Sequence, residues 1–458
     1  MRIVVVGGGI AGLAAALRLR ERAGDAADIV VVERSDRLGG KLRTVTFAGQ
    51  PVETGAETFL MRENGAESAV LGVARQVGLG DDMVHPAPVG AAIAVAGQLH
   101  PIPGGTLLGI PTTSSDVDGL AKIADGDLDE GRPLLAPGED IAVGRLVRQR
   151  FGYDVVNHLV EPMLGGVYAG RADRLSLAAT VPALHTAAQR EHTLDGAVRA
   201  ALAAGLRPPG APVFATVRGG LTRLVEAIAA AARVRVTFGA PVRELTRTGG
   251  RWRLVAGSTR DPQEHIADAV VLAVPAFPAR RLLRGVDESA AAEVAALDYA
   301  SVALVTLALP AGSRLPELSG FLVPPAEDHA VKAATFFTTK WPHLRADGGP
   351  VLLRASLGRY CDGRVLQRTD DDLVTVVRDD LAALLGSPLP HPLAVRVNRW
   401  GGALPQYGVG HVSRVARARA ALPPTLALAG AAYDGVGIAA CVRSGQTAAD
   451  AVSLAVGE

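Results

Sequence analysis

The first residues whose types and spacing could do chemistry are three glycines near the N-terminus. Gly7, Gly9 and Gly12 follow the β-branched run Arg2–Val6, and Glu33 lies 21 residues after Gly12. In a dinucleotide-binding turn, the first glycine permits a tight turn, the second lets the backbone approach a pyrophosphate, and the third lets helix and strand pack closely. The helix N-terminus offers free N–H groups and a partial positive charge. Glu33 is placed to accept hydrogen bonds from ribose hydroxyls, so the pattern predicts a dinucleotide site.

A second group of glycines and cations comes just past the second predicted strand. The pair Gly39–Gly40 is followed by Lys41 and Arg43, and Gly55 begins a further glycine turn. Two interpretations of the cations stay open at this point. They either extend a phosphate-binding site or form a solvated basic surface.

The last thirty residues carry the third pattern. Residues 425–429 are predicted to form a strand, Gly430 to begin a turn, and Gly435–Gly437 to begin a helix. This turn is rich in small residues, and its only charged side chains are Asp434 and Arg443. Small side chains let a flat ring lie against backbone, and a helix N-terminus favours an electron-rich group. The alternative is a packing site between helices.

Other elements must position these motifs. Apolar runs predict strands at 2–6, 28–34 and 233–245, which includes Val242, and a strand followed by a helix over 268–283. Periodic apolar residues predict helices over 141–161 and about 175–205. Runs within 298–400 are typical of antiparallel strands. Residues 114–140 are polar, acidic and rich in Gly and Pro, so we expect an exposed segment.

Composition excludes several classes of protein. The chain has 458 residues, of which 48% are hydrophobic and 20% charged, so it is long enough for two or three domains. Lys and Arg number 47 and Asp and Glu 46, a balance that argues against a nucleic-acid surface. Two cysteines favour a reducing cytosol. The sequence has no apolar run long enough for a transmembrane helix and no metal-binding motif. We therefore predict a cytoplasmic protein without a metal, and leave peripheral membrane contact open.

Longer runs carry a family resemblance. The most specific are EPMLGGVYAGRADRLSLAAT at 161–180 and RWGGALPQYGVGH at 399–411. With VVVGGGIAGLAAA, VVERSDRLGGKLRT and GAAYDGVGIAACVRSGQ, they make the chain resemble the oxygen-dependent, FAD-containing porphyrinogen oxidases. More narrowly, it is similar to the bacterial coproporphyrinogen III oxidases, formerly called protoporphyrinogen oxidases. Ala56, Glu57 and Thr58 stand where that family often has Pro, Asp and Ser, and the cofactor is expected to be unchanged.

The resemblance implies an α/β fold of mixed α+β character: a two-dinucleotide-binding-fold flavoprotein of the amine-oxidase type. Residues 1–72, 209–297 and 401–458 would form the FAD-binding domain. Residues 73–112 and 298–400 would form the substrate-binding domain around an inserted sheet. Residues 113–208 would form a helical cap, whose contact with a membrane stays open.

The resemblance also implies which residues contact the ligands. The predicted FAD-binding residues are Gly7, Gly8, Gly9, Ile10, Ala11, Gly12, Glu33, Arg34, Gly40, Lys41, Gly55, Ala56, Glu57, Thr58, Val242, Trp400, Val436, Gly437 and Ile438. The predicted substrate residues are Arg62, Tyr168, Arg171 and Arg174, chosen because arginine pairs well with propionates. For these four, a salt-bridge or core role is the open alternative. No catalytic acid or base is predicted.

The implied reaction is a six-electron oxidation of coproporphyrinogen III to coproporphyrin III in haem biosynthesis, with O2 consumed and H2O2 formed. Protoporphyrinogen IX oxidase and flavin amine oxidase are the two alternatives. The expected partners are the porphyrinogen, O2 and a ferrochelatase-type recipient of the product.

Overall fold

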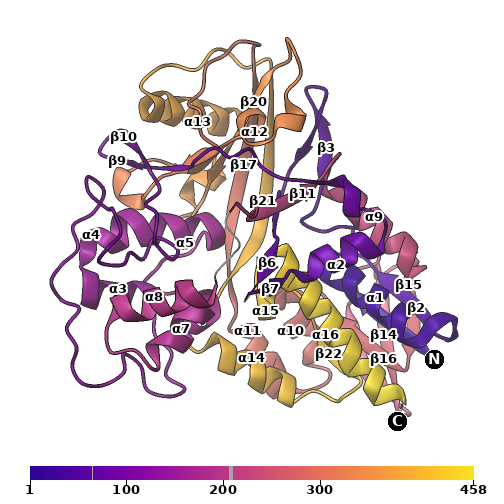
Figure 1. The fold of residues 1–458 in the computed structure, drawn as a ribbon. Helices are drawn as coiled ribbons and strands as arrows, with labels where there is room; N and C mark the ends of the chain where they lie inside the picture. The colour runs from indigo at the N-terminus through magenta and orange to yellow at the C-terminus, as the bar shows by residue number, and fades with distance from the viewer. Residues whose placement is uncertain (64, 206–209, 458) are drawn as a thin grey trace.

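The computed structural model describes residues 1–63, 65–205 and 210–457. A parallel sheet of five strands, in the order β12-β2-β1-β16-β22, lies in the part of the molecule that holds both termini (Figure 1). Its strands are β1 (Arg2–Val6), β2 (Asp28–Val32), β12 (Arg235–Thr237), β16 (Ala269–Leu272) and β22 (Leu426–Leu428). The strands β1, β2, β16 and β22 are mostly Val, Ile, Leu and Ala because helices or a second sheet bury both faces, whereas the edge strand β12 is more exposed.

The two ends of the chain pack together on one face of this sheet. Helix α1 (Ile10–Ala23) lies along helix α16 (Ile438–Gly457), and α9 (Leu221–Ala232) covers the same face. A Cβ added at Gly445 of α16 would lie 2.1 Å from the carbonyl oxygen of Ala11. The glycine is therefore needed for the close approach of the first and last helices.

The opposite face of the parallel sheet packs against helices and a small sheet. Its apolar core joins Val4 and Trp252 with α10 (Ala276–Leu283) and α11 (Glu288–Ala295). The remaining elements of this part are α2 (Ala69–Gln76), α14 (His411–Ala420), α15 (Ala431–Asp434), β3 (Thr44–Phe47), β4 (Gln50–Glu53), β5 (Phe59–Leu60), β6 (Arg62–Glu63), β7 (Ala66–Glu67), β8 (Met83–Val84), β11 (Phe214–Val217), β13 (Glu244–Thr248), β14 (Arg251–Gly257) and β15 (Pro262–Ala267).

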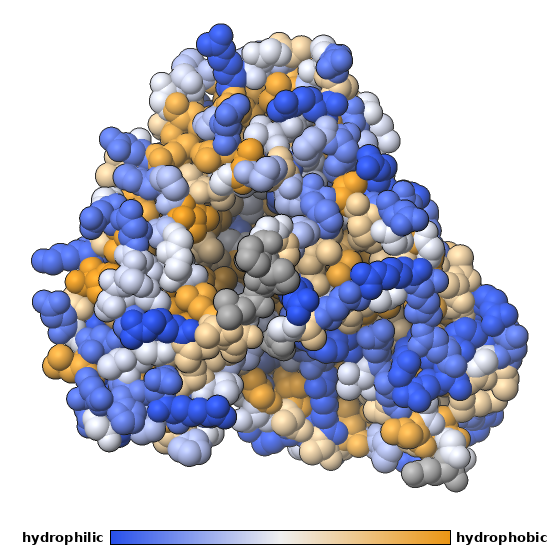
Figure 2. Space-filling model, in the orientation of Figure 1, coloured by the Kyte–Doolittle hydropathy of each residue, from blue (hydrophilic) through white to orange (hydrophobic). Residues whose placement is uncertain are grey.

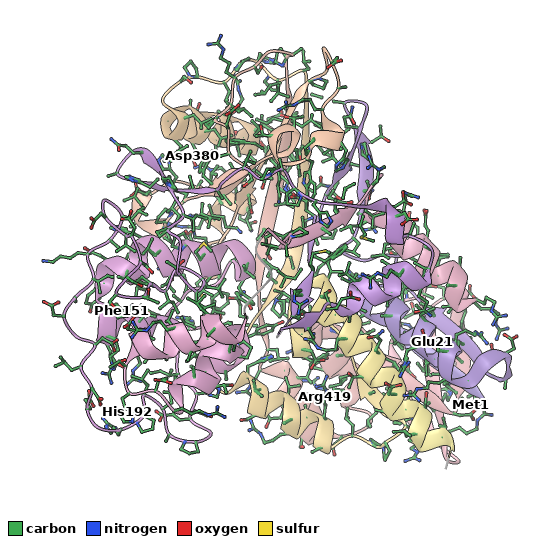
Figure 3. All side chains as sticks on the ribbon, in the orientation of Figure 1. Met1, Glu21, Phe151, His192, Asp380 and Arg419 are labelled. Carbon is green, nitrogen blue, oxygen red and sulfur yellow. The ribbon has the colours of Figure 1, made fainter. Side chains whose placement is uncertain are left out.

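A second large sheet has seven strands in the order β10-β9-β18-β19-β20-β17-β21. They are β9 (Ala92–Val95), β10 (Gln98–Pro101), β17 (Asp298–Leu309), β18 (Gly320–Leu322), β19 (Val331–Phe336), β20 (Val351–Leu357) and β21 (Ala394–Gln406), with α12 (Phe337–Lys340) following β19. All neighbours are antiparallel except β18 and β9. Helix α13 (Asp370–Leu385), which carries Asp380 in Figure 3, buries one face of this sheet.

The third part is a group of helices around one core that contains Phe151 (Figure 3). They are α3 (Val143–Phe151), α4 (Tyr153–Val155), the π-helical turn Val156–Val160, α5 (Glu161–Tyr168), α6 (Leu177–Thr180), α7 (Pro182–Ala188) and α8 (Leu194–Ala204). Most of residues 114–140 are exposed, as expected, and their few buried side chains pack onto this group. Leu120 and Leu135 are buried, and Asp127 accepts hydrogen bonds from the N–H groups of Leu194 and Asp195.

The mixed α/β fold class is confirmed, and two local expectations need correction. Val242 lies between β12 and β13, not in a strand. Helix α16 begins at Ile438, and the short helix α15 occupies the turn before it. The predicted boundary between residues 208 and 209 lies outside the described residues, so the domain division stays a prediction. No helix in the described ranges has the length and hydrophobicity needed to span a membrane.

Candidate active site

The first glycine turn has the geometry that its spacing predicted. Gly7 has a φ of +106°, and a Cβ there would lie 2.5 Å from the carbonyl oxygen of Ala273. A Cβ at Gly12 would lie 2.0 Å from the carbonyl oxygen of Gly7. Gly9 differs, because a Cβ there meets nothing within 4 Å. Packing therefore explains Gly7 and Gly12, whereas Gly9 stands at the N-terminus of α1 beside open space, with Ile10 and Ala11 buried behind it.

Glu33 lies directly after β2 and is fixed beside this turn. Its carboxylate accepts hydrogen bonds from the N–H groups of Gly8 (2.7 Å) and Ser35 (2.8 Å) and is buried. The N–H of Ala240 donates to the Glu33 carbonyl oxygen at 2.9 Å, which brings Val242 to the same edge of the sheet. Arg34 points to solvent. These predicted FAD-binding residues thus share one location, and their contacts with a ligand stay predictions.

The second glycine pair folds over the first turn. The N–H of Gly39 donates to the Gly8 carbonyl oxygen at 2.8 Å, and a Cβ at Gly40 would lie 3.3 Å from Gly9 Cα. Burial lowers the pKa of Lys41. Lys41 makes no salt bridge with the residues that the structure describes. A largely buried ammonium without an acid favours an anionic partner from outside the chain.

The third glycine turn, Gly55–Thr58, is tied to the seven-stranded sheet. The Glu57 carboxylate is bound by the Lys340 ammonium (2.7 Å), the Arg354 guanidinium (2.6 Å) and the indole N–H of Trp341 (2.8 Å). Burial raises the pKa of Glu57, but the two cations outweigh burial and lower it to about 2. All this bonding is internal. Glu57 therefore fixes the turn, and its predicted contact with a cofactor stays untested.

Trp400 of β21 packs on the same turn from the other side. Its indole N–H donates to the Thr54 carbonyl oxygen at 2.6 Å, and its Cζ2 lies 3.2 Å from the position that a Cβ on Gly55 would take. The sheet and the glycine turn therefore meet at Trp400.

The one acidic residue of the closing turn, Asp434, is neutralised by an arginine of this chain. Asp434 is paired with the Arg419 guanidinium at 2.6 Å and accepts a hydrogen bond from the Ser444 hydroxyl. Val436 is half-buried and Ile438 is buried, while Gly437 is exposed, and a Cβ at Gly437 meets nothing within 4 Å. The N-terminus of α16 is therefore open, like that of α1, and carries no uncompensated negative charge.

These features fit a flavin dinucleotide. The N-termini of α1 and α16 both follow strands of the parallel sheet at their carboxyl ends, and both are open at a glycine, Gly9 and Gly437. Backbone N–H groups there suit a pyrophosphate and a ring edge that becomes negative on reduction. Lys41 adds a cation next to the glycine pair.

The sequence did not reveal the cations of the seven-stranded sheet. Leu353 and Ala355 of β20 pack toward α13, so alternation points Arg354 to the opposite face. The Arg354 guanidinium confirms this direction, because it donates to the carbonyl oxygens of Glu53 and Gly55. The sheet face opposite α13 therefore lies against the third glycine turn, Gly55–Thr58.

Two further cations lie on this face. Thr306 of β17 pairs with Arg354 on one side and with Arg396 of β21 on the other. Lys332 of β19 points toward α5, where its ammonium lies 3.4 Å from the Gly165 carbonyl oxygen. The face that could hold a substrate thus carries Lys332, Arg354 and Arg396. Figure 2 shows the molecule hollowed near the middle of one face, between the helical group and the part that holds α2 and α16.

Of the four predicted substrate residues, Tyr168 ends α5, Arg171 and Arg174 lie between α5 and α6, and Arg62 lies on β6. Tyr168 is buried against Tyr407, with ring centroids 5.6 Å apart, and burial raises its pKa to about 12. Arg171 lies 2.7 Å from the Glu161 carboxylate, and Arg174 is exposed beside Tyr360. Arg62 is exposed on β6 and donates to the carbonyl oxygen of Gly65. Their contacts with a substrate stay predictions.

Comparisons with known proteins assign the family. Residues 10–453 match the family described as flavin containing amine oxidoreductase. The coproporphyrinogen III oxidase of Mycobacterium tuberculosis H37Rv is 40% identical, covering 98% of this chain and 96% of the relative. That of Bacillus subtilis is 32% identical, covering 97% and 96%. The crystal structure of a provisionally named protoporphyrinogen oxidase from Exiguobacterium sp. 255-15 has a TM-score of 0.85 and 33% identity, with 99% of each chain covered.

The fold, the two open helix N-termini and these matches agree. The protein is an oxidoreductase with a flavin cofactor. The chain belongs to the flavin-containing amine oxidoreductase family and, within it, to the porphyrinogen oxidases that include the bacterial coproporphyrinogen III oxidases.

Proposed function

We propose that the chain is an FAD-dependent oxidase that converts coproporphyrinogen III to coproporphyrin III in haem biosynthesis. The reaction removes six electrons and six protons from the macrocycle in three two-electron steps. Each step reduces one O2 to one H2O2, so three O2 are consumed for each porphyrin formed. The product is a metal-free porphyrin, which makes a ferrochelatase-type enzyme the proposed recipient.

The cation-bearing face of the seven-stranded sheet is the observation that carries this proposal. Lys332, Arg354 and Arg396 share the face that lies against the glycine turn. Coproporphyrinogen III has four propionates, whereas protoporphyrinogen IX has two propionates and two vinyl groups. Arg and Lys bind carboxylates well, and an amine substrate would be repelled as a cation. Arg354 is paired with Glu57, so Lys332 and Arg396 are the two cations of this face that form no salt bridge within the described ranges, and they favour the substrate with four carboxylates.

The chain's own residues would act by binding and orientation. FAD, when bound, supplies the two-electron acceptor. The open backbone at Gly9 and Gly437 and the ammonium of Lys41 would hold its pyrophosphate and ring edge, and Glu33 would hold the ribose. The substrate is electron-rich and gains conjugation at each step, so fixed geometry and electrostatics can supply most of the rate acceleration.

A second candidate function is protoporphyrinogen IX oxidase, because the relative from Exiguobacterium carries that provisional name. A third, flavin amine oxidase, follows only from the breadth of the family model.

The purified protein in air tests all three. We expect a flavin spectrum and release of FAD on denaturation. We also expect coproporphyrin III to form, with one H2O2 produced for each O2 taken up. Higher kcat/KM for protoporphyrinogen IX would replace the proposal with the second function. Oxidation of alkylamines without porphyrinogen turnover would replace it with the third.

A further inference from the structure

Lys332 is a charged residue in the middle of a buried strand. It is 6% exposed, in the otherwise uncharged segment VKAATF of β19. Its ammonium has one hydrogen bond in the described structure, to the Gly165 carbonyl oxygen at 3.4 Å, which is long for such a bond. Within the described ranges, no carboxylate forms a salt bridge with it. Burying an ammonium without an acid is costly, so such a group calls for an explanation.

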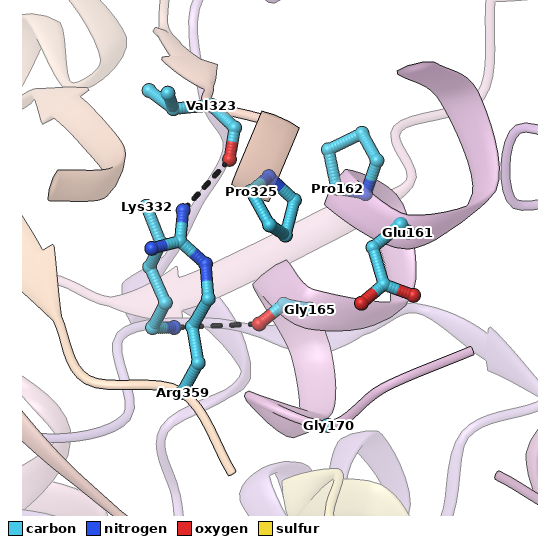
Figure 4. Close-up of a pocket in the computed structure, with 8 residues that line it drawn as sticks. All are labelled: Glu161, Pro162, Gly165, Gly170, Val323, Pro325, Lys332 and Arg359. Atoms are coloured by element: carbon cyan, nitrogen blue, oxygen red, sulfur yellow. Dashed lines mark hydrogen bonds between the residues drawn. The ribbon is translucent and has the colours of Figure 1, made fainter. Parts of the chain in front are cut away.

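A pocket between α5 and the sheet contains this ammonium (Figure 4). Arg359 extends into the same pocket beside Lys332, and its guanidinium donates to the carbonyl oxygens of Val323 (3.0 Å) and His329 (3.2 Å). Carbonyl oxygens are neutral acceptors, and Arg359 forms no salt bridge within the described ranges, although burial lowers its pKa and the nearby carboxylates of Asp362, Glu161 and Asp380 raise it. The pocket thus holds two buried cations side by side.

The one acid of the pocket is already bound. Glu161 accepts a hydrogen bond from the N–H of Ala172 at 2.6 Å, and its carboxylate lies 2.7 Å from Arg171. Figure 4 places the Glu161 carboxylate on the far side of the pocket from Lys332 and Arg359. Burial, and then the charges of Arg359 and Arg354, lower the pKa of Lys332 to about 7. Burial is the larger cause and repulsion by the two arginines adds to it, and an incoming anion would offset both.

The size of the pocket limits the ligand. The pocket is small, with room for about one water molecule. It could take at most the end of one carboxylate side chain, and it excludes a ring of four pyrroles. Because Lys332 and Arg354 belong to neighbouring strands, the pocket adjoins the sheet face proposed to hold the macrocycle.

We propose that Lys332 and Arg359 form a carboxylate subsite that binds one propionate of the substrate and favours porphyrinogens with four propionates over those with two. This inference rests on the proposed function and names residues that set its specificity. Lys332 would donate to the carboxylate directly, and Arg359 would add a second charge without leaving its carbonyl partners.

Substitution of Lys332 tests the subsite. Lys332→Met keeps the length and removes the charge, and Lys332→Arg restores a cation. Lys122→Met is the matched control, because Lys122 is exposed in the 114–140 segment. Binding of coproporphyrin III and protoporphyrin IX to the holoenzyme is measured by fluorescence, together with kcat/KM for both porphyrinogens. Lys332→Met should weaken coproporphyrin III binding about tenfold or more, protoporphyrin IX binding less than twofold, and Lys332→Arg should recover most of the loss. Equal losses for both porphyrins, or no loss, would overturn the subsite.

A second measurement needs no variant. The chain has only four lysines, Lys41, Lys122, Lys332 and Lys340. Lysine labelled with 13C at Cε gives four resolvable signals, and Lys332→Arg assigns one of them. Coproporphyrin III should raise the pKa of Lys332 above its value in the free holoenzyme, and protoporphyrin IX should leave it unchanged.

The two proposals fail in different ways. If neither porphyrinogen is oxidised but coproporphyrin III still raises the pKa of Lys332, the proposed function is wrong and the subsite stands. If coproporphyrinogen III is oxidised while the Lys332 signal does not respond to its product, the subsite is wrong and the function stands.

Discussion

Arg354 and Arg396 flank Thr306 on one face of the seven-stranded sheet, because β20 and β21 both pair with β17 at that residue. The two arginines differ in their partners. Arg354 is bound to the Glu57 carboxylate, whereas Arg396 donates only to the side-chain oxygen of Asn398 at 3.1 Å and makes no salt bridge within the described ranges. Arg354 is therefore part of the scaffold, and Arg396 is the cation free to meet a substrate carboxylate.

Arg396→Met is expected to lower kcat/KM for coproporphyrinogen III about tenfold to a hundredfold, since a hydrogen bond to a charged group contributes about 1.5–3 kcal/mol. Melting temperature should change little. Arg399→Met is the control, because Arg399 lies on the opposite face of the same strand and pairs with Asp370 of α13. Steady-state kinetics on both variants checks this. Equal activity of the two variants would exclude Arg396 from the substrate site.

The elements around the first glycine turn could be predicted because their signals are local. The β-branched run, the glycine spacing and the acid at residue 33 all lie within one βαβ unit, and the structure has β1, α1 and β2 where they were expected. Val242 was wrongly placed in a strand because the alternating run that contains it is interrupted at Gly239 and Pro241. The segment there instead forms backbone hydrogen bonds to Glu33 and Ser35.

The cations of the sheet could not be predicted from alternation alone. Period-two patterning says that Arg354 and Ser356 share a face, but not that α13 covers the other one, because that depends on packing of distant segments. The pairing of Asp434 with Arg419 was equally hidden, since a strand separates them. Lys332 did leave a signal, which is a single charge within an apolar strand.

Gly437→Ala tests the open N-terminus of α16. A Cβ there has no neighbour within 4 Å, so the apoprotein should keep its stability or gain slightly. A methyl group aimed at the ring edge should weaken flavin binding about tenfold or more. Gly72→Ala in α2 is the control, because a Cβ at Gly72 also meets no atom. Titration of apoprotein with FAD measures the effect, and unchanged affinity for Gly437→Ala would place the ring elsewhere.

Glu57→Gln should destabilise the protein at neutral pH by about 3 kcal/mol, because Lys340 and Arg354 then lose a buried carboxylate. The folded pKa of Glu57, about 2, lies below its ordinary value of 4.5. Its contribution is therefore present above pH 4.5 and is lost as pH falls toward 2. Denaturant unfolding at pH 7 and pH 3.5 should show a smaller difference between wild type and variant at the lower pH. Glu67→Gln, which breaks an exposed pair with Arg75, should cost less than about 1 kcal/mol at both.

Arg419→Met should make reduction of the bound flavin harder. The change leaves the Asp434 carboxylate uncompensated, two residues before Val436 at the turn that would face the ring. A negative charge there opposes the charge that the ring gains on reduction. We expect the midpoint potential to fall by about 30 mV or more, which corresponds to ~1.4 kcal/mol for two electrons. Arg419→Lys keeps the charge and should stay near wild type. Spectroelectrochemical titration of the three proteins decides the matter, and equal potentials would contradict the compensating role of Arg419.

Lys332→Met should stabilise the ligand-free protein, which is the opposite of its effect on binding. The pKa of Lys332 is about 7 in the folded chain and ordinarily 10.5. Between these values the unfolded chain holds a proton that the folded chain lacks, so this group disfavours folding most below pH 7 and ceases to do so above pH 10.5. The variant should therefore gain on the order of 1–3 kcal/mol in its free energy of unfolding at pH 6.5 and less at pH 9.

The charged groups that face Lys332 are Arg359, Arg354 and Glu161. The first two are cations, and Glu161 is paired with Arg171, so none of them is an acid partner for Lys332. Thermal unfolding at the two pH values checks this. A variant less stable than wild type at pH 6.5 would mean that Lys332 stabilises the fold and is not kept for binding a ligand.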